Sequence, residues 1–183
     1  MNYRDFSVKT VREAGDILLE SIKSDFEVTT KGGDWRNILT SVDLKLNEFL
    51  INEIKTNFSE HNIYSEEGGD KETKSEYLWV IDPIDGSSNF SRGIPHFAIC
   101  LGVLRNSVPL AGAVFNPITN ELFSFEKGKG AFLNDKPIRV SSVETLPDAA
   151  ILLHIGRKKE LWDWGLGLHK KFLAEAKKSA NLG

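Results

Sequence analysis

The residues best suited to chemistry in this sequence are acidic side chains that follow two apolar runs. Glu66 and Glu67 follow the first, short run. Asp82 and Asp85 follow the second run, which spans 77–81. Short apolar runs are typical of buried strands, so we expect both acidic pairs at strand ends. If the two strands are neighbours, three or four carboxylates converge on one place.

Converging carboxylates of this kind predict a bound cation. Like charges held close together repel one another strongly unless a cation lies between them. A ligand set of oxygen atoms alone, without His or Cys, favours a hard ion and therefore Mg²⁺ before Zn²⁺. The sequence thus predicts a magnesium site where the two strands end.

The segment after Asp82 is expected to leave the sheet and to begin a helix. Pro83 has no N–H group to donate and should stop regular strand pairing. The segment 86–89 then predicts the start of a short helix, whose first N–H groups attract anions. Metal ions beside an anion site are the equipment of phosphoryl transfer. The alternative is a strand, an Asp-Pro turn and a small-residue loop without chemistry.

The string from Trp79 to Phe90, with the acidic pair upstream, resembles the signature of the inositol monophosphatase family. Relatives of that family include bisphosphate nucleotidases and archaeal-type fructose-1,6-bisphosphatases. Three further segments fit the same pattern: Thr40-x-x-Asp43, Gly93-x-Pro95-His96-Phe97 and 128–134. The resemblance therefore runs along nearly the whole chain.

The resemblance implies an α+β fold, the layered αβαβα sandwich of the sugar-phosphatase type. Two N-terminal helices would pack on an antiparallel sheet, and a second α/β layer would begin near the end of the chain. Apolar spacing predicts the helices over 3–28 and from Thr40. Short turns between apolar runs predict the antiparallel strands: 97–104, 109–115, 121–125 and 131–133. A polar stretch suggests domains at 1–143 and 144–183, the second with a strand over 149–153 and a helix over 158–177.

The resemblance also assigns the predicted metal site. Two or three Mg²⁺ ions would be held by four residues: Glu66, Asp82, Ile84 through its carbonyl, and Asp85. The reaction would be attack by water without a phosphoenzyme, with inhibition by Li⁺. Lys31, in a glycine-containing loop, could reach a phosphate, and plain solvent exposure is the alternative.

The same resemblance names the groups that would handle the proton and the substrate. Glu67, Ser87 and Asp43 would be catalytic, with Asp43 orienting the Ser87 hydroxyl. Capping of the second helix by the Thr40–Asp43 pair is an equally good interpretation of Asp43. Substrate contacts would come from five residues: Glu66, Ile84, Asp85, Gly86 and Ser87.

Composition narrows the class of partner. The chain has 183 residues, a net charge of −3 and 40% hydrophobic residues, which indicates a soluble globule without a basic face for nucleic acid. Its one cysteine, Cys100, excludes an internal disulfide and fits a reducing compartment. Without a signal peptide or an apolar run near ~20 residues, we expect a cytoplasmic protein without membrane contact. The family resemblance implies a small phosphorylated substrate and a homodimer.

The end of the sequence departs from the family pattern. Family members continue past Gly183 into a segment whose Trp-Asp motif supplies another metal ligand, so the second ion would lack a carboxylate here. Trp162-Asp163 does not replace it, because we assign this pair to a surface helix.

Inositol 1-phosphate is the first expected substrate, and fructose 1,6-bisphosphate or a 3′(2′),5′-bisphosphate nucleotide are the alternatives. A metal-binding or association module without turnover is the alternative from another class.

Overall fold

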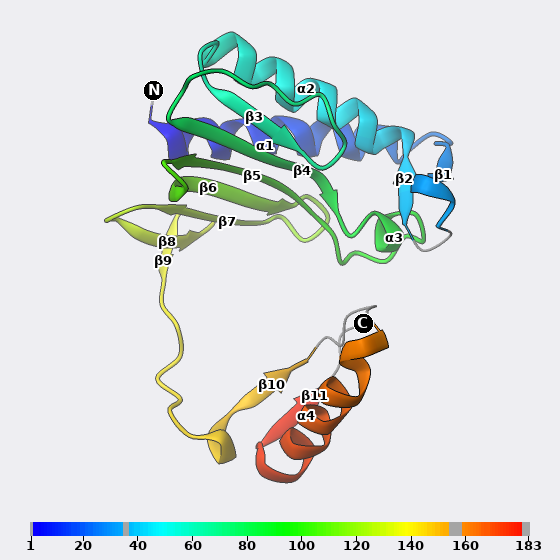
Figure 1. The fold of residues 1–183 in the computed structure, drawn as a ribbon, viewed down its shortest axis with the longest axis vertical. Helices are drawn as coiled ribbons and strands as arrows, with labels where there is room; N and C mark the ends of the chain where they lie inside the picture. The colour runs from blue at the N-terminus through cyan, green and yellow to red at the C-terminus, as the bar shows by residue number, and fades with distance from the viewer. Residues whose placement is uncertain (1, 35–36, 154–158, 181–183) are drawn as a thin grey trace. The chain divides into compact units, whose positions relative to one another are not determined.

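The computed structural model describes residues 2–34, 37–153 and 159–180. The chain divides into two compact units, 1–138 and 139–183. The larger unit holds two long helices, a two-stranded hairpin and a seven-stranded sheet. Figure 1 shows these elements in chain order, and each unit is described by itself.

The two long helices begin at residues whose side chains satisfy free backbone N–H groups. Helix α1 (Tyr3–Ser21) follows Asn2, whose side chain accepts the N–H of Arg4 at 2.9 Å. Helix α2 (Ser41–Asn57) follows Thr40, and the expected capping box with Asp43 is present in full. The capping prediction is therefore confirmed.

The first predicted helix is wrong beyond Ser21. Residues 23–25 are polar and end the apolar spacing, and the chain then enters strand β1 (Val28–Thr30). That strand pairs antiparallel with β2 (Ile38–Thr40). The single helical turn η1 (Lys31–Gly33) joins them, with Gly32 and Gly33 at φ +59° and +75°. These left-handed angles explain why glycines occupy the predicted loop.

The main sheet has the strand order β3-β4-β5-β6-β7-β8-β9. Its strands are β3 (Asn62–Ser65), β4 (Tyr77–Asp85), β5 (Ala98–Arg105), β6 (Val108–Asn116), β7 (Glu121–Glu126), β8 (Gly130–Leu133) and β9 (Lys136–Ile138). All neighbours from β4 to β9 are antiparallel, as predicted for β5 to β8, whereas β3 joins β4 in parallel. Strand β9 was not predicted, because Pro137 lies within its three residues.

Strand β4 continues past the point where Pro83 was expected to end it. The strand runs to Asp85, with a shift of its register against β5 between Asp82 and Asp85. Such a bulge leaves an extra residue without a partner and turns the strand. The proline therefore interrupts the pairing instead of stopping it.

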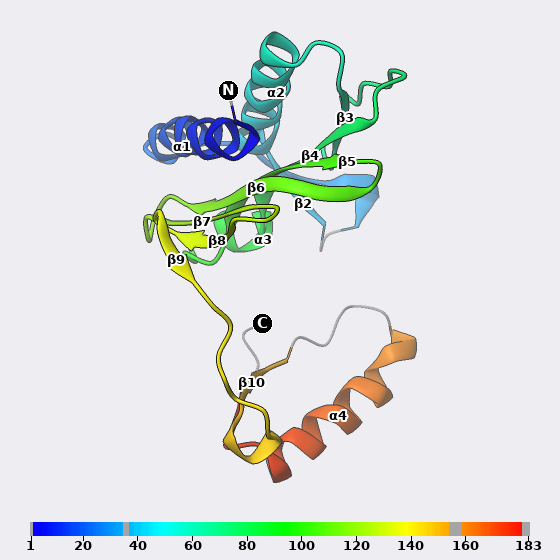
Figure 2. The same ribbon diagram turned by 90° about the vertical axis from the view of Figure 1, so that its left-hand side faces the viewer.

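Helices α1 and α2 lie on the same side of the main sheet, as Figure 2 shows. Their apolar faces and the inward side chains of β4, β5 and β6 form the core, with Trp79, Leu18 and Ile99 fully buried. At Gly15 the helix comes so close to β6 that an added Cβ would lie 2.5 Å from the Phe115 ring. This layer of two helices on a sheet confirms the predicted fold class.

The smaller unit is a strand–helix–strand element. Strand β10 (Ala150–Leu152) pairs in parallel with β11 (Lys178–Ala180), and α4 (Trp162–Glu175) connects them. This confirms the expected start of an α/β layer. The predicted helix over 158–177 is shorter in the structure, and Lys158 lies outside the described residues. Asp163 lies exposed in the first turn of α4.

Two single turns of 3₁₀ helix complete this unit, η2 (Leu146–Asp148) and η3 (Lys159–Leu161). The side chains that α4 exposes include Trp164, Leu166 and Leu173. Across the described part of the chain, no helix combines the length and apolar character needed to span a bilayer.

Candidate metal and phosphate site

The parallel pairing of β3 and β4 brings the two predicted acidic segments together. Ser65 pairs with Ile81, and the N–H of Glu66 donates to the carbonyl of Ile81 at 3.2 Å. Because both strands run in the same direction, Glu66, directly after the end of β3, lies next to Asp82 within β4. The register thus places these two side chains side by side.

Burial and the crowding of carboxylates both act on the pKa of Asp82. Burial, then the charges of Glu66 and Asp85, raise the pKa of Asp82 to about 7, and a hydrogen bond with Glu66 acts in the same direction. At neutral pH, the charged form of a carboxyl group with this pKa is disfavoured compared with that of an ordinary aspartate. A cation among the three groups would relieve that cost.

Lys31 supplies positive charge to the acidic pair. Its Nζ donates to Glu67 Oε1 at 2.6 Å and to Glu66 Oε1 at 3.1 Å. The Lys31 side chain is 21% exposed, and that of Glu67 only 5%. Burial alone would lower the pKa of Lys31, but the bonds to both carboxylates raise it. The plain solvent-exposed lysine considered from the sequence is therefore wrong.

Glu67 has a pKa raised by burial, although its bond with Lys31 counteracts the shift. The charges of Asp43 and Glu66 add to the effect of burial. A carboxylate with a raised pKa is a better proton acceptor near neutral pH than an ordinary glutamate.

Asp43 connects helix α2 to the loop that follows β4. One of its carboxylate oxygens accepts the N–H and the hydroxyl of Thr40. The other oxygen lies 2.8 Å from Ser87 Oγ, which is also 2.8 Å from the carbonyl of Ile84. Asp43 is fully buried, so it caps α2 and contacts Ser87 at the same time.

The turn at Gly86 requires a residue without a side chain. Gly86 has φ +91° and ψ +32°, the left-handed region, and precedes the four-residue helix α3 (Ser87–Phe90). A Cβ there would lie 2.9 Å from the carbonyl oxygen of His96. That same oxygen accepts a bond from Asn89 Nδ2 at 2.8 Å. The segment around His96 therefore supports the turn through its backbone.

Two buried polar residues beside this site were not predicted from the sequence. Asn47 on α2 and Ser65 at the end of β3 are 8% and 4% exposed, and they bond to each other. One signal was present: Asn47 stands four residues after Asp43, one helical turn further on.

Cys100 pairs with Asp82 across β4 and β5. Burial and the nearby charges of Asp82 and Asp85 raise the pKa of its thiol to about 12. The thiol is therefore protonated at neutral pH, in agreement with a structural interpretation of this cysteine.

The donor atoms of the site suit a hard ion, although they do not converge on a single position in this structure. The donors are carboxylate and carbonyl oxygens, from Glu66, Asp82, Asp85 and Ile84. Within the residues that the structure describes, no three His, Cys, Asp or Glu side chains form a group that could hold a metal ion as they stand. The ammonium of Lys31 already engages Glu66 and Glu67, which is a physical reason for the open arrangement.

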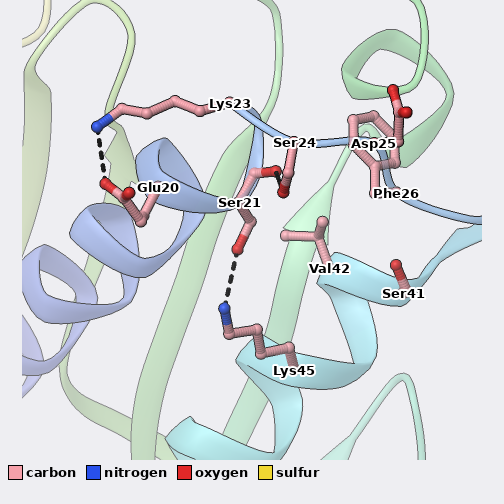
Figure 3. Close-up of a pocket in the computed structure, with 9 residues that line it drawn as sticks. All are labelled: Glu20, Ser21, Lys23, Ser24, Asp25, Phe26, Ser41, Val42 and Lys45. Atoms are coloured by element: carbon pink, nitrogen blue, oxygen red, sulfur yellow. Dashed lines mark hydrogen bonds and ion pairs between the residues drawn. The ribbon is translucent and has the colours of Figure 1, made fainter.

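A separate cavity of about 500 Å³ lies between the end of α1 and the start of α2. Figure 3 shows that its two lysines already have partners: Lys23 pairs with Glu20 at 2.7 Å, and Lys45 donates to Ser21 at 3.2 Å. None of the predicted site residues lines this cavity.

The two-helix layer, the mixed sheet and the acidic strand ends define a layered α+β fold of the sugar-phosphatase type. The model of the inositol monophosphatase family matches residues 2–161. This chain belongs to that family.

Individual relatives agree with this membership. The chain is 35% identical over 162 residues to inositol monophosphatase 3 of Solanum lycopersicum, covering 86% of this chain and 60% of the relative. It is 37% identical over 148 residues to a fructose-1,6-bisphosphatase/inositol-1-monophosphatase of Thermotoga maritima, covering 81% and 57%. The extragenic suppressor protein suhB of Bartonella henselae superposes with a TM-score of 0.88 at 27% identity, over 98% of this chain and 69% of that one. The chain thus spans less than two thirds of the length of the tomato and Thermotoga maritima relatives.

Proposed function

We propose that this chain carries the metal and phosphate site of a Mg²⁺-dependent phosphomonoesterase. The substrate is a small phosphorylated polyol, with inositol 1-phosphate as the first candidate. The observation that supports this most strongly is the parallel register of β3 and β4, which sets Glu66 beside Asp82.

Glu66, Asp82, Asp85 and the carbonyl of Ile84 would hold two or three magnesium ions. When bound, the ions neutralise phosphate charge and make a water molecule more acidic. Of the four donors, Asp82 has the environment least suited to a lone charge, since its pKa is raised to about 7.

The proton is handled by Glu67 and Ser87. Ser87 can donate its single hydroxyl proton to the buried Asp43 carboxylate, which leaves the oxygen lone pairs of Ser87 to accept a bond from water. Glu67, with its raised pKa, takes up the proton that the attacking water loses. Asp43 orients the hydroxyl and stays fixed by its cap to Thr40.

The phosphate would be bound where α3 begins. Gly86 and Ser87 present the first N–H groups of this short helix, which have no partner within the helix itself. Because Gly86 lacks a Cβ, the phosphate oxygens can approach the backbone closely. Glu66, Ile84 and Asp85 complete the substrate contacts.

The names of the relatives support the proposed substrate class. One is named an inositol monophosphatase and another a fructose-1,6-bisphosphatase/inositol-1-monophosphatase. Both names describe phosphate esters of small polyhydroxyl compounds. Fructose 1,6-bisphosphate is thus the second substrate to assay, and a 3′(2′),5′-bisphosphate nucleotide the third. A cytoplasmic location, a homodimer and sensitivity to Li⁺ belong to the same proposal.

Phosphate release from inositol 1-phosphate tests the proposal. We expect release with Mg²⁺ and none without it, and a loss of at least about 10²-fold in Asp82→Asn, which removes a charged ligand. Asp16→Asn, an exposed position on α1, is the matched control and should match the original chain. Equal release by Asp82→Asn and Asp16→Asn would refute the proposal.

The affinity for Mg²⁺ should also depend on pH. The pKa of Asp82 is raised to about 7, so lowering the pH from 8 to 6 protonates this ligand and weakens binding. Calorimetric titration with Mg²⁺ at both pH values measures this. An affinity that does not fall at pH 6 would contradict a role for Asp82 as ligand.

A second candidate function is a metal-binding module without turnover. The open arrangement of ligands among the described residues favours it. Calorimetry combined with the assay separates the two candidates. Weak Mg²⁺ binding without phosphate release supports the module, whereas tight binding with release supports the enzyme.

A further inference from the structure

The turn that carries Glu66 and Glu67 contacts Ile81 through the N–H of Glu66 and Lys31 through both carboxylates, but its backbone contains two glycines. Glu66 is exposed, and Gly68 and Gly69 follow directly with φ of +82° and +86°. Glycines in these angles leave the backbone many alternatives when it is not held from outside. The position of both carboxylates therefore depends on what fixes residues 65–68.

A pair of buried polar side chains fixes this turn. Ser65 Oγ donates to Asn47 Oδ1 at 2.6 Å and accepts the N–H of Glu67 at 3.3 Å. Asn47 Nδ2 donates to the carbonyl of Gly68 at 3.0 Å. The amide of Asn47 thus bonds to the turn at both of its ends: Oδ1 accepts from Ser65, and Nδ2 donates to Gly68.

The same helix also holds the other half of the site. Asp43 and Asn47 stand four residues apart on α2, so both side chains lie on one face of the helix. Asp43 contacts Ser87 after β4, while Asn47 contacts Ser65 and Gly68 after β3. One rigid helix therefore sets the distance between the two acidic strand ends.

We propose that Asn47 is a positioning residue that, through Ser65 and Gly68, holds Glu66 and Glu67 in register with Asp82. The expected effect of Asn47 on Mg²⁺ affinity rests on the proposed function. The amide is required because both a donor and an acceptor are used. A leucine in its place would supply neither, and an aspartate would turn a negative oxygen toward the carbonyl of Gly68.

The test compares Asn47→Leu and Asn47→Asp with Asn52→Leu, an exposed asparagine on the same helix. In the full chain, we expect both Asn47 variants to weaken Mg²⁺ binding by about 10–100-fold in calorimetry, the usual effect of removing a residue that supports metal ligands. Asn52→Leu should bind Mg²⁺ as the original chain does. If Asn47→Leu fails to fold, Asn47→Asp, which keeps the acceptor for Ser65, decides the matter.

Hydrogen exchange gives a second measurement that does not involve the metal. The N–H of Gly68 donates to the carbonyl of Ser65 at 3.1 Å, and that of Glu67 to the Ser65 hydroxyl. Both amides should exchange about tenfold faster in the Asn47 variants, because the turn opens more often, whereas the amides of β6 should not change.

Each outcome decides the inference. Unchanged exchange of these two amides, or unchanged Mg²⁺ affinity in a folded Asn47 variant, overturns it. If the original chain binds no Mg²⁺ at all, the proposed function fails, and exchange at Glu67 and Gly68 alone then decides whether Asn47 holds the turn.

Discussion

Helices α1 and α2 lie in the same layer on the same sheet, but their buried polar residues have different partners. On α1, the Ser7 hydroxyl donates back to the carbonyl of Tyr3 in its own helix. The Thr10 hydroxyl is buried without a hydrogen-bond partner in the part of the chain that the structure describes. On α2, Asp43 and Asn47 bond across to Ser87, Ser65 and Gly68, the loops of the candidate site. The difference teaches that α1 provides packing, whereas α2 provides packing and also aligns the site.

Asp43→Asn is the substitution with the largest expected effect, and it tests whether α2 aligns the candidate site. Asp43 accepts three hydrogen bonds from Thr40 and Ser87, and an amide group can replace only one of its two oxygens. We expect phosphate release to fall by about 10²–10⁴-fold and the free energy of unfolding by about 1–3 kcal/mol. Activity assays and urea unfolding measure the two effects. Glu48→Gln, exposed on the same helix, is the control, and an equally active Asp43→Asn would contradict the role of α2.

Gly15→Ala tests the packing role of α1. The added Cβ would lie 2.5 Å from the Phe115 ring and 3.3 Å from Pro117. Overpacking of this kind costs about 1–3 kcal/mol, which should exceed the gain of about 1 kcal/mol in helix propensity. We expect a lower free energy of unfolding in urea, with activity per folded molecule preserved. The neighbouring exposed position supplies the control, Asp16→Ala. An increase in stability in Gly15→Ala would show that α1 is not tightly packed there.

Thr10→Val should give the smallest effect and one of opposite sign. The hydroxyl of Thr10 is fully buried and has no hydrogen-bond partner among the described residues. Replacing it by a methyl group of similar size removes the cost of an unsatisfied polar group, so we expect a gain of about 1 kcal/mol in the free energy of unfolding. Thr40→Val is the matched comparison, because it removes a capping hydroxyl and should cost about 1 kcal/mol. A loss of stability in Thr10→Val would reveal a partner for its hydroxyl.

The sequence predicted those features that depend on local patterns. The capping box of Thr40 and Asp43, the antiparallel strands β5 to β8, and the acidic residues near the ends of β3 and β4 all follow from residue spacing. The family resemblance added the layered fold. The sequence analysis did not predict features that depend on contacts distant in sequence. The end of α1 at Ser21 was missed because the hairpin of β1 and β2 replaces its last turns.

Within the candidate site, features with a local sequence pattern were likewise predicted, and contacts between distant segments were not. Glu66 and Asp82 were expected to lie together, and their placement in adjacent parallel strands agrees with that expectation. The contact of Lys31 with Glu66 and Glu67 crosses from one loop to another and has no local signal. The bond from Asn47 to Ser65 likewise links two elements whose spacing in the sequence carries no information on their distance. The catalytic and metal-binding roles stay predictions until they are measured.

The parallel pairing of β3 with β4 has a consequence for the order of folding. Strands β5 to β9 follow one another through short turns, whereas β4 is reached from β3 across residues 66–76 and leads to β5 across residues 86–97. Contacts that close longer loops form more slowly. We therefore expect strands β5 to β9 to become protected first during refolding, with the N–H of Glu66 protected in a later phase. The acidic residues of the candidate site would then come together only after most of the main sheet has formed.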